Sequence, residues 1–379
     1  MELLIRKELF GATCFCPATA NRFYLNQSEL ISFIKDGILP FDIKLKKCKS
    51  VSYKLIKPKL IQENKFSFAD TIYIELTRKC NLQCKHCLNN SGRELENQLT
   101  KDEVLNLICN LYNAGVQELR FTGGEPLLFC GIGECIKLAH NLGLKTSLGT
   151  NGTMLTEERI KQLKDAGLDQ IVVSIDGTKE VHDKIRGVGN FDRALKGLMH
   201  AINRGIDVRV NSVLMKNNQE EIIELAKQLN KKGIKLFIRR FIQTGRAENL
   251  VDMELSPEEY LNVKNRLNEE LKNNVQGHGL KNNNGTTSRI PLTFEIDTCR
   301  AGQRTLDITP DGNIYPCGFL AAKGYKSLGN IRNIDDWNCF WYNLQADSDL
   351  KNLRNNMKKY NETHIDKITC LAKFYKKES

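Results

Sequence analysis

Residues 71–87 read TIYIELTRKCNLQCKHC, and this stretch decides how the chain folds. Its first part, Thr71–Thr77, is rich in β-branched and aromatic side chains, which is typical of a strand. Cys80, Cys84 and Cys87 follow directly, with three and then two residues between them. Because these spacings wrap three soft thiolate ligands around one point, the stretch predicts a metal centre in the loop after a strand.

Strand and helix patterns alternate through the middle of the chain. The apolar residues of the first helical stretch, for example, recur at the spacing of one helix face. Further strands are predicted at 116–121, 144–149, 169–175, 206–213 and 234–240, and helices at 101–114, 132–142, 156–166, 191–204 and 219–232. This alternation predicts an α/β fold with a parallel sheet and helices outside, and it leaves both a doubly wound sheet and a barrel open.

The composition excludes several classes of protein. Of the 379 residues 41% are hydrophobic and 27% charged, which excludes a disordered or collagen-like chain. No stretch approaches the ~18 consecutive apolar residues of a membrane span, and the charged N-terminus lacks the apolar run of a signal peptide. We therefore expect a cytoplasmic protein without a membrane partner, in which clustered cysteines bind metal instead of forming disulfides.

Both ends of the chain differ from its middle in charge. Residues 1–65 hold twelve Lys and Arg against six Asp and Glu, and residues 351–379 hold eight against three, so these ends account for the net charge of +11. Such basic segments favour an acidic peptide or a nucleic acid as partner, or serve solubility alone. Residues 1–65 are predicted to form a small α+β domain, with a hairpin of 12–17 and 21–25, a helix at 28–35 and a strand at 51–56.

A third domain is predicted after the helix at 257–273. Residues 272–288 are rich in Asn, Lys and Gly, which is typical of a flexible connection. Short strands are predicted at 292–296 and 305–309, and the Pro-Asp-Gly turn at 310–312 leads into another at 313–315. The sequence therefore predicts three domains, with a small and separate cysteine-bearing module at the C-terminus: 1–65, 66–275 and 285–379.

The cysteine loop and four later stretches resemble the radical S-adenosylmethionine (SAM) superfamily over residues 70–250. The later stretches are GGEP at 123–126, TNG at 150–152, SIDG at 174–177 and Asn211. The resemblance implies a partial (β/α)6 TIM-like barrel, with ligands at the carboxyl ends of its strands. It also implies a 4Fe–4S cluster whose open iron binds SAM, and a 5′-deoxyadenosyl radical that abstracts hydrogen. Zinc, with His86 as a fourth ligand, is the alternative.

The resemblance carries a set of cofactor-binding residues onto this sequence. The three cysteines of the loop hold the SAM-binding cluster, and SAM contacts are expected from Gly123, Gly124, Glu125, Pro126, Asn151, Ser174, Asn211, Arg239 and Arg240. Consecutive strand residues face opposite sides, so one arginine of the pair points inward, unless both form a solvated basic rim. No catalytic acid or base is identified. Asp183 and Arg186 resemble a segment of one subgroup or form a structural ion pair, and Glu75 is expected to face the barrel interior.

The C-terminal cysteines resemble those of a SPASM domain or of its shorter twitch relative. Cys299, Gly312 and Cys317 form the pattern C-x12-G-x4-C, but the dense cysteine run of a full SPASM domain is missing and only Cys370 follows. The resemblance implies one auxiliary iron–sulfur cluster on Cys299, Cys317 and Cys370. Cys339 is a possible fourth ligand, although its surroundings resemble a packed helix, and a module without a cluster is the alternative. The remaining six cysteines are expected to be small buried side chains.

Enzymes with such modules mostly modify ribosomally made peptides, so the resemblance implies a peptide maturase. Residues 1–65 would grip the precursor peptide by adding it as a β-strand, and a flavodoxin or ferredoxin would supply electrons. The alternative is a radical SAM enzyme acting on a small-molecule cofactor or antibiotic precursor. A nucleic-acid binder is unlikely, because no nucleic-acid motif accompanies the basic ends.

Overall fold

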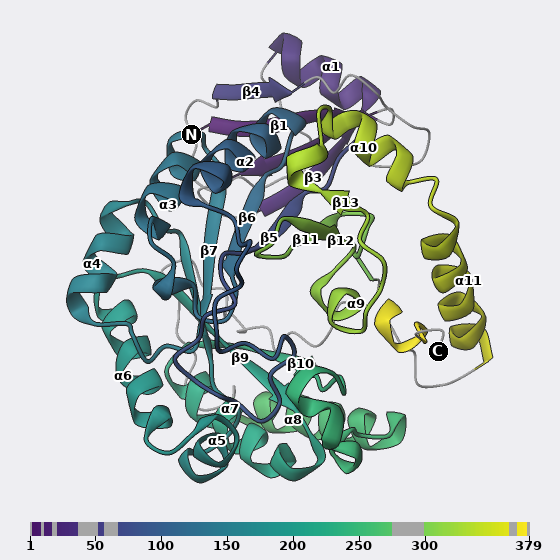
Figure 1. Cartoon of the computed structure of the whole chain (residues 1–379). Helices are drawn as coiled ribbons and strands as arrows, with labels where there is room; N and C mark the ends of the chain where they lie inside the picture. Colours follow the sequence, from purple (N-terminus) through teal and green to yellow (C-terminus); the bar gives the residue numbers. More distant parts are fainter. Residues whose placement is uncertain are drawn as a thin grey trace.

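The computed structural model describes residues 2–8, 11–16, 21–36, 52–56, 67–274, 299–363 and 370–376. A small N-terminal sheet lies at one end of a curved central sheet, and a C-terminal module follows the edge of the central sheet (Figure 1). The predicted connection and the strand at 292–296 lie outside the described residues after 274. The predicted domain boundaries fall in or beside such ranges and stay a prediction. In the described part of the chain, no helix has the length and apolarity needed to cross a membrane.

Six parallel strands form the central part of the large sheet. They lie side by side in chain order: β5 (Thr71–Glu75), β6 (Glu118–Thr122), β7 (Lys145–Thr150), β8 (Gln170–Ser174), β9 (Asp207–Leu214) and β10 (Lys235–Arg240). A doubly wound sheet would reverse this order partway, so the order identifies an open barrel. The predicted α/β barrel is therefore confirmed.

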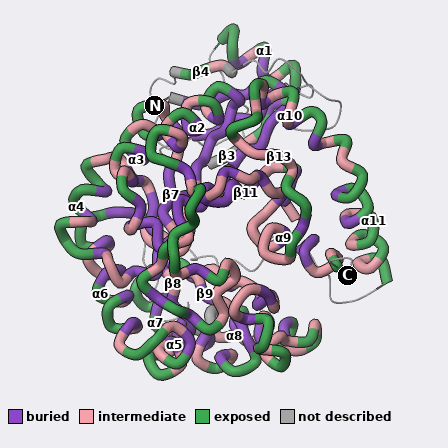
Figure 2. The backbone as a smooth tube through the Cα atoms, viewed as in Figure 1, coloured by how far each residue is buried: buried purple, intermediate pink, exposed green. Residues whose placement is uncertain are grey.

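Helices cover the outer face of this sheet (Figures 1 and 2). They are α2 (Lys101–Ala114), α3 (Ile132–Asn141), α4 (Glu157–Asp165), α6 (Asn190–Asn203), α7 (Gln219–Lys231) and α8 (Pro257–Asn274). At the start of α2, Thr100 and Glu103 form a reciprocal capping box, which satisfies backbone N–H groups that the helix leaves unpaired. The short helix α5 (Lys179–Arg186) was not predicted, because only two of its residues are buried.

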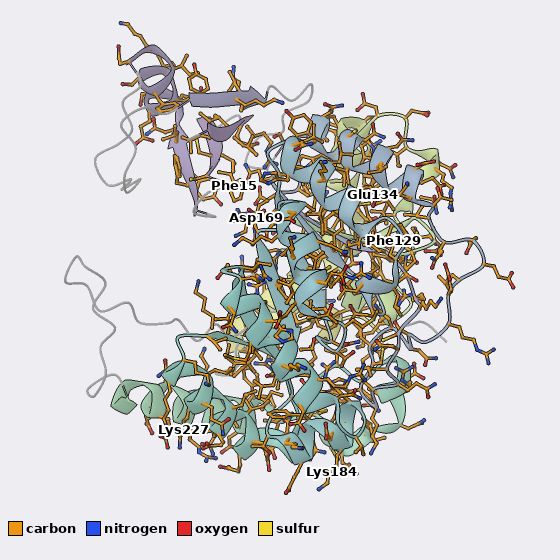
Figure 3. The ribbon with its side chains drawn as sticks, turned by 90° about the vertical axis from the view of Figure 1, so that its left-hand side faces the viewer. Phe15, Phe129, Glu134, Asp169, Lys184 and Lys227 are labelled. Carbon is orange, nitrogen blue, oxygen red and sulfur yellow. The ribbon has the colours of Figure 1, made fainter. Side chains whose placement is uncertain are left out.

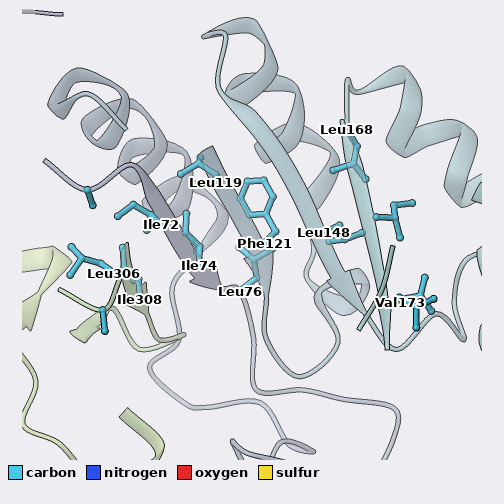
Figure 4. Packing of buried hydrophobic residues seen from close by; sticks show 14 of the residues in the cluster. Ile72, Ile74, Leu76, Leu119, Phe121, Leu148, Leu168, Val173, Leu306 and Ile308 are labelled. Atoms are coloured by element: carbon cyan, nitrogen blue, oxygen red, sulfur yellow. The ribbon is translucent and has the colours of Figure 1, made fainter. Parts of the chain in front are cut away.

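The strands alternate between apolar and polar side chains, and this alternation separates the core from the cavity. Ile72, Ile74, Leu119 and Phe121 are fully buried against the helices (Figure 4). The residues between them, such as Tyr73, point to the inner face instead. The hydrophobic core therefore lies under the helices, and the inner face is left to polar residues.

The C-terminal module continues the barrel sheet. Strand β11 (Thr305–Ile308) pairs in parallel with β5, and β12 (Asn313–Tyr315) and β13 (Gly329–Asn330) extend the sheet in antiparallel fashion. Leu306 and Ile308 pack beside the β5 isoleucines (Figure 4). The predicted C-terminal module therefore shares both the sheet and the core with the barrel at this edge. Three helices complete it: α9 (Gly318–Ala322), α10 (Trp337–Leu344) and α11 (Ser348–Thr363).

The N-terminal part forms a four-stranded sheet in the order β3-β2-β1-β4. Strands β2 (Gly11–Cys16) and β3 (Asn21–Asn26) form the predicted hairpin, followed by α1 (Gln27–Asp36), while β4 (Ser52–Ile56) pairs with β1 (Glu2–Glu8). Strand β1 was not predicted, because its charged residues hide the alternation. One face of the sheet packs on α1. On the other face, Phe15 is 1% exposed and lies toward the barrel (Figure 3).

A buried ion-pair group joins the N-terminal sheet to the barrel. The Arg6 guanidinium of β1 donates to Asp70 Oδ1 at 3.0 Å and also to the Ala69 carbonyl. The other Asp70 oxygen accepts from Arg304 at 2.5 Å and from Arg300 at 3.3 Å. One buried carboxylate therefore ties together the N-terminal sheet, the start of β5 and the segment before β11.

Candidate active site

A cavity of about 650 Å³ lies on the inner face of the barrel sheet. Residues at the ends of β5 to β10 line it, and so does the C-terminal module. Both groups of predicted ligand cysteines border this cavity: Cys80, Cys84 and Cys87 from the loop after β5, and Cys299, Cys317 and Cys370 from the module. The structure thus brings together two cysteine groups that lie more than 200 residues apart in the sequence.

Backbone N–H groups point at the sulfurs of the first cysteine group. The Leu82 N–H donates to Cys80 Sγ at 3.4 Å, and the Ser91 N–H donates to Cys87 Sγ at 3.4 Å. Such donors stabilise thiolates bound to iron and tune the potential of a cluster. Burial raises the pKa of the Cys80 thiol to about 11, so metal binding must displace a proton. These residues fit an iron–sulfur cluster.

The third cysteine, Cys84, adjoins a buried charge network. Arg186 Nη1 contacts Cys84 Sγ at 3.9 Å, and its Nε donates to Asp176 Oδ2 at 2.6 Å. The same Asp176 oxygen lies 2.7 Å from His86 Nε2. His86 therefore packs beside the cysteine loop with one ring nitrogen engaged, and Arg186 pairs with Asp176 instead of Asp183. Asp183 accepts instead from backbone N–H groups at the start of α6.

Residues after β10 fix the far side of the cysteine loop. The Arg246 N–H donates to the Cys87 carbonyl at 3.1 Å, and its Nε donates to the Cys84 carbonyl at 2.8 Å. Gly245 has φ +61°, and a Cβ there would lie 2.5 Å from the Cys87 carbonyl oxygen. The sequence contains Gly245-Arg246 as a recognisable pair, but only the structure shows that it positions the cysteine loop.

Substituting Gly245 by alanine is expected to disturb this loop. The methyl group would have to displace backbone oxygens that lie under 3 Å away, in addition to holding a left-handed conformation. We expect a loss of about 2 kcal/mol or more of folding free energy and reduced iron retention. Gly143→Ala is the matched control, because Gly143 has φ +78° with nothing within 4 Å of the added carbon. Equal losses in both variants, measured by chemical denaturation, would contradict the close approach.

Gly123 and Gly124 follow β6 and lie against the start of the cysteine loop. The Gly124 N–H donates to the Thr77 carbonyl at 2.7 Å, and a Cβ on Gly124 would lie 2.4 Å from the Lys79 carbonyl oxygen. Both glycines line the cavity. The double glycine therefore permits a close backbone approach, as its residue type suggests.

Glu125 lies beneath the cavity and is fully buried. Its carboxylate accepts from Thr150 Oγ1 at 2.8 Å and from the N–H groups of Asn151 and Leu127 at 2.9 and 3.2 Å. Burial raises its pKa to about 7 against the effect of these donors. Glu125 and Pro126 do not border the cavity, so their contact with SAM stays a prediction; in the structure Glu125 joins the ends of β6 and β7.

Three further predicted SAM residues line the cavity. Asn151 Nδ2 donates to Asn81 Oδ1 at 2.8 Å, which links the end of β7 to the cysteine loop. Ser174 of β8 and Asn211 of β9 are register partners, so their side chains lie side by side. The structure thus gathers residues from successive strand ends around one space, as the barrel requires.

Arg239 and Arg240 both border the cavity, but they face different neighbours. The Arg239 guanidinium lies 4.5 Å from the ring centre of Phe237, which lines the inner face. The Arg240 guanidinium lies 3.7 Å from the ring centre of Tyr260 on α8. Strand alternation therefore directs Arg239 into the barrel and Arg240 toward the helix side.

The second cysteine group lies at the module side of the cavity. Burial raises the pKa of Cys317 well above its usual value, and the nearby Cys370 and Cys299 raise it further. Cys339 is exposed on the packed helix α10 and does not border the cavity, which disfavours it as a fourth ligand. Of the six cysteines expected to be buried, Cys14, Cys16 and Cys135 are buried, Cys109 is half-buried, Cys130 is exposed, and Cys48 lies outside the described residues.

Two carboxyl groups that were not recognised as a pair lie between the cysteine groups. Glu75 of β5 was expected to face inward, and it does; Asp307 of β11 hydrogen-bonds to it. Burial raises the pKa of both groups, and the charge of Glu75 raises the pKa of Asp307 further. The alternation of β11 could have placed Asp307 inward, but the pairing of β11 with β5 has no sequence signal.

Comparisons with known proteins agree with this geometry. Residues 74–229 match the model of the radical SAM superfamily, and residues 299–363 match the SPASM iron–sulfur cluster-binding domain. The AdoMet-dependent heme synthase of Oleidesulfovibrio alaskensis is 30% identical over 288 residues, which cover 68% of this chain and 71% of that protein. The chain therefore belongs to the radical SAM superfamily and is a radical SAM enzyme with a SPASM module. Its cofactors are a 4Fe–4S cluster and SAM, with auxiliary iron–sulfur in the module.

Other similar proteins include a maturase and a protein solved with a bound precursor peptide. The mycofactocin maturase MftC of Mycolicibacterium smegmatis is 28% identical, covering 73% of this chain and 71% of that protein. The structure of SuiB from Streptococcus suis bound to its precursor peptide SuiA superimposes with a TM-score of 0.68 at 18% identity, covering 90% of this chain and 87% of that chain. At this identity the match shows a shared fold.

Proposed function

We propose that this enzyme modifies a ribosomally made peptide, abstracting hydrogen from it to give a crosslink or a related change. The observation that carries the proposal is one cavity bordered by both cysteine groups, because a peptide side chain would fit between them. The similarity to MftC, a maturase, and the fold shared with the peptide-bound SuiB support it. We also propose that the enzyme works in the cytoplasm with a flavodoxin or ferredoxin as electron donor.

Within this proposal each cysteine group holds one cluster. Cys80, Cys84 and Cys87 would hold the cluster that binds SAM, and Cys299, Cys317 and Cys370 would hold the auxiliary one. When bound, the first cluster and SAM supply a 5′-deoxyadenosyl radical. The chain's own residues would orient SAM at the strand ends. They are Gly123, Gly124, Asn151, Ser174, Asn211 and Arg239, with Glu125 and Pro126 shaping the loop beneath.

The N-terminal sheet is the proposed grip for the peptide. Strands β3 and β4 form its two edges, and an edge strand offers unpaired backbone groups to an added strand. Residues 1–65 carry a net charge of +6, which suits an acidic peptide. The Arg6–Asp70 ion pair holds this sheet against the barrel, so a bound peptide would start close to the cavity.

Removing residues 1–65 is expected to weaken binding of the precursor peptide at least tenfold, because the added strand would lose its partner. The precursor encoded beside this chain is titrated against the full chain and the shortened chain by anaerobic calorimetry. SAM cleavage without peptide serves as the folding control. Unchanged peptide affinity in a shortened chain that still cleaves SAM would contradict the recognition role.

A small-molecule substrate is the second candidate. One relative that is 30% identical is named an AdoMet-dependent heme synthase, so its product is a porphyrin. The two candidates are separated by asking which addition stimulates formation of 5′-deoxyadenosine, the precursor peptide or an iron porphyrin. Stimulation by the porphyrin alone would replace the peptide proposal.

A further inference from the structure

Three arginines and a tyrosine form a group on the inner face of the barrel, below the residues predicted to bind SAM. Arg120 lies on β6, Arg209 on β9, Arg300 just before β11 and Tyr73 on β5, and all four line the cavity. The three strand residues lie farther from the carboxyl ends of their strands than the predicted SAM contacts. On β9, for example, Arg209 lies two residues before Asn211. We call this group the arginine floor.

The cations of the arginine floor converge on Tyr73. Arg120 Nη1 donates to the Tyr73 hydroxyl at 2.8 Å. Although burial opposes it, the pKa of Tyr73 is lowered, because the charges of Arg120, of Arg239 and then of Arg209 lie close to it. Arg300 also lies within electrostatic range of Arg120 and Tyr73.

The counter-charges of the floor are already shared. Arg120 pairs with Glu118 through two nitrogens, at 3.0 and 3.3 Å. Arg300 forms an ion pair with Asp70, which also forms ion pairs with Arg6 and Arg304. Neither carboxylate is therefore available to neutralise a further cation.

Arg209 has no such partner. Its guanidinium lies 5.7 Å from the ring centre of Phe237, and it forms no ion pair with any carboxylate in the parts of the chain that the structure describes. Its Nε, like that of Arg300, is buried without a hydrogen-bond acceptor among those residues. Burial and then the charge of Arg120 lower the pKa of Arg209 to about 10. The Arg209 side chain is half-buried, and a buried guanidinium nitrogen without an acceptor is costly unless an anion binds there.

We propose that the arginine floor binds a carboxylate of the substrate. This inference rests on the proposed function, since a ribosomal peptide carries carboxylates and no phosphates; the bound group would be an Asp or Glu side chain near the attacked residue. The planar fork of a guanidinium matches a carboxylate with two parallel hydrogen bonds. The floor lies farther from the carboxyl ends of the strands than the predicted SAM contacts, so the two anions occupy separate places in the cavity.

The test uses the reconstituted full chain with SAM and two peptide pools. One pool holds seven-residue peptides with a central Asp or Glu, and the other holds the same peptides with Asn or Gln. Affinity selection with mass spectrometry measures the ratio of acidic to amide peptides retained. Wild type is expected to favour the acidic pool ten- to a hundredfold, as a charged hydrogen-bonded pair implies. Arg209→Gln should remove this preference, and Arg209→Lys should keep part of it.

Arg159→Gln is the control variant, because Arg159 is half-buried on α4, does not line the cavity and should leave the preference unchanged. Iron content and thermal unfolding show whether each variant is folded. Glutarate, titrated by anaerobic calorimetry, is the small-molecule arm. Because the wild-type comparison of the two pools needs no substitution, a failure of Arg209→Gln to fold leaves the test intact.

The outcomes distinguish the proposed carboxylate site from the proposed peptide substrate. Preference for acidic peptides that depends on Arg209 supports both. Binding of glutarate that depends on Arg209, with neither pool retained, supports the carboxylate site and contradicts the peptide substrate. Equal retention of both pools by wild type, or an acidic preference that Arg209→Gln leaves intact, overturns the carboxylate site while the peptide function stands.

Discussion

Replacing Cys80, Cys84 and Cys87 together by alanine is expected to lower the iron content from about eight to about four atoms per chain. The same variant should lose SAM cleavage completely, because these thiols border the space where the predicted SAM residues converge. Iron, sulfide and zinc are measured after anaerobic reconstitution, and 5′-deoxyadenosine is measured after reduction.

The matched variant replaces Cys299, Cys317 and Cys370 by alanine. It should also lose about four irons, from the auxiliary site, so the two variants together account for both clusters. Cys339→Ala should lose none, because Cys339 is exposed away from the cavity. About four irons in wild type and none in the first variant would leave the module without a cluster. Zinc uptake without iron or sulfide would contradict the assignment of the cysteine loop.

Asp176→Asn is expected to cost about 3–5 kcal/mol of folding free energy, since it leaves buried positive charge unpaired. The Asp176 side chain is fully buried and its carboxylate binds both Arg186 and His86. Arg186 also contacts Cys84 Sγ, so the variant should hold less iron in the cysteine loop. Chemical denaturation of the metal-free chain separates the loss of stability from the loss of metal. Asp192→Asn, whose ion pair with Lys179 is exposed, is the control and should cost under about 1 kcal/mol.

Acid should remove the same stabilisation in the wild type. Although burial opposes it, Arg186 and His86 hold the pKa of Asp176 well below the ordinary value of 3.8. The unfolded chain therefore binds a proton before the folded chain does, and stability falls as the pH drops below about 4. The difference between the denaturation midpoints of wild type and Asp176→Asn should narrow as the pH falls from 6 to 3, because only the unfolded chain takes up the proton in this range. A gap that stays constant over this range would contradict the ionised state of Asp176.

The sequence predicts the barrel well because its signals are local. Period-two strands such as 71–77 and amphipathic helices such as 101–114 each reveal themselves within one window. The order of strands follows from short connections between neighbours. Strand β1 escaped prediction, because Arg6 and Glu8 are buried charged residues in a short strand, and their burial depends on the distant Asp70.

The residues of the candidate site also fall into those with a local sequence signal and those without one. The cysteine loop and the double glycine at 123–124 are contiguous motifs, so their place at the cavity could be anticipated. The pairing of Asp307 with Glu75 and the contact of Gly245 with Cys87 join residues far apart in the chain. No local pattern encodes such contacts, because they arise from the packing of β11 on β5 and of the segment after β10 on the cysteine loop.

The parallel pairing of β11 with β5 limits how the enzyme can move during turnover. One cysteine group follows β5, and Cys299 and Cys317 of the other flank β11 and β12. Both groups are therefore attached to neighbouring strands of one hydrogen-bonded sheet. The distance between the two cysteine groups should therefore stay constant. The rate of electron transfer between the clusters that they hold should then not vary with substrate binding.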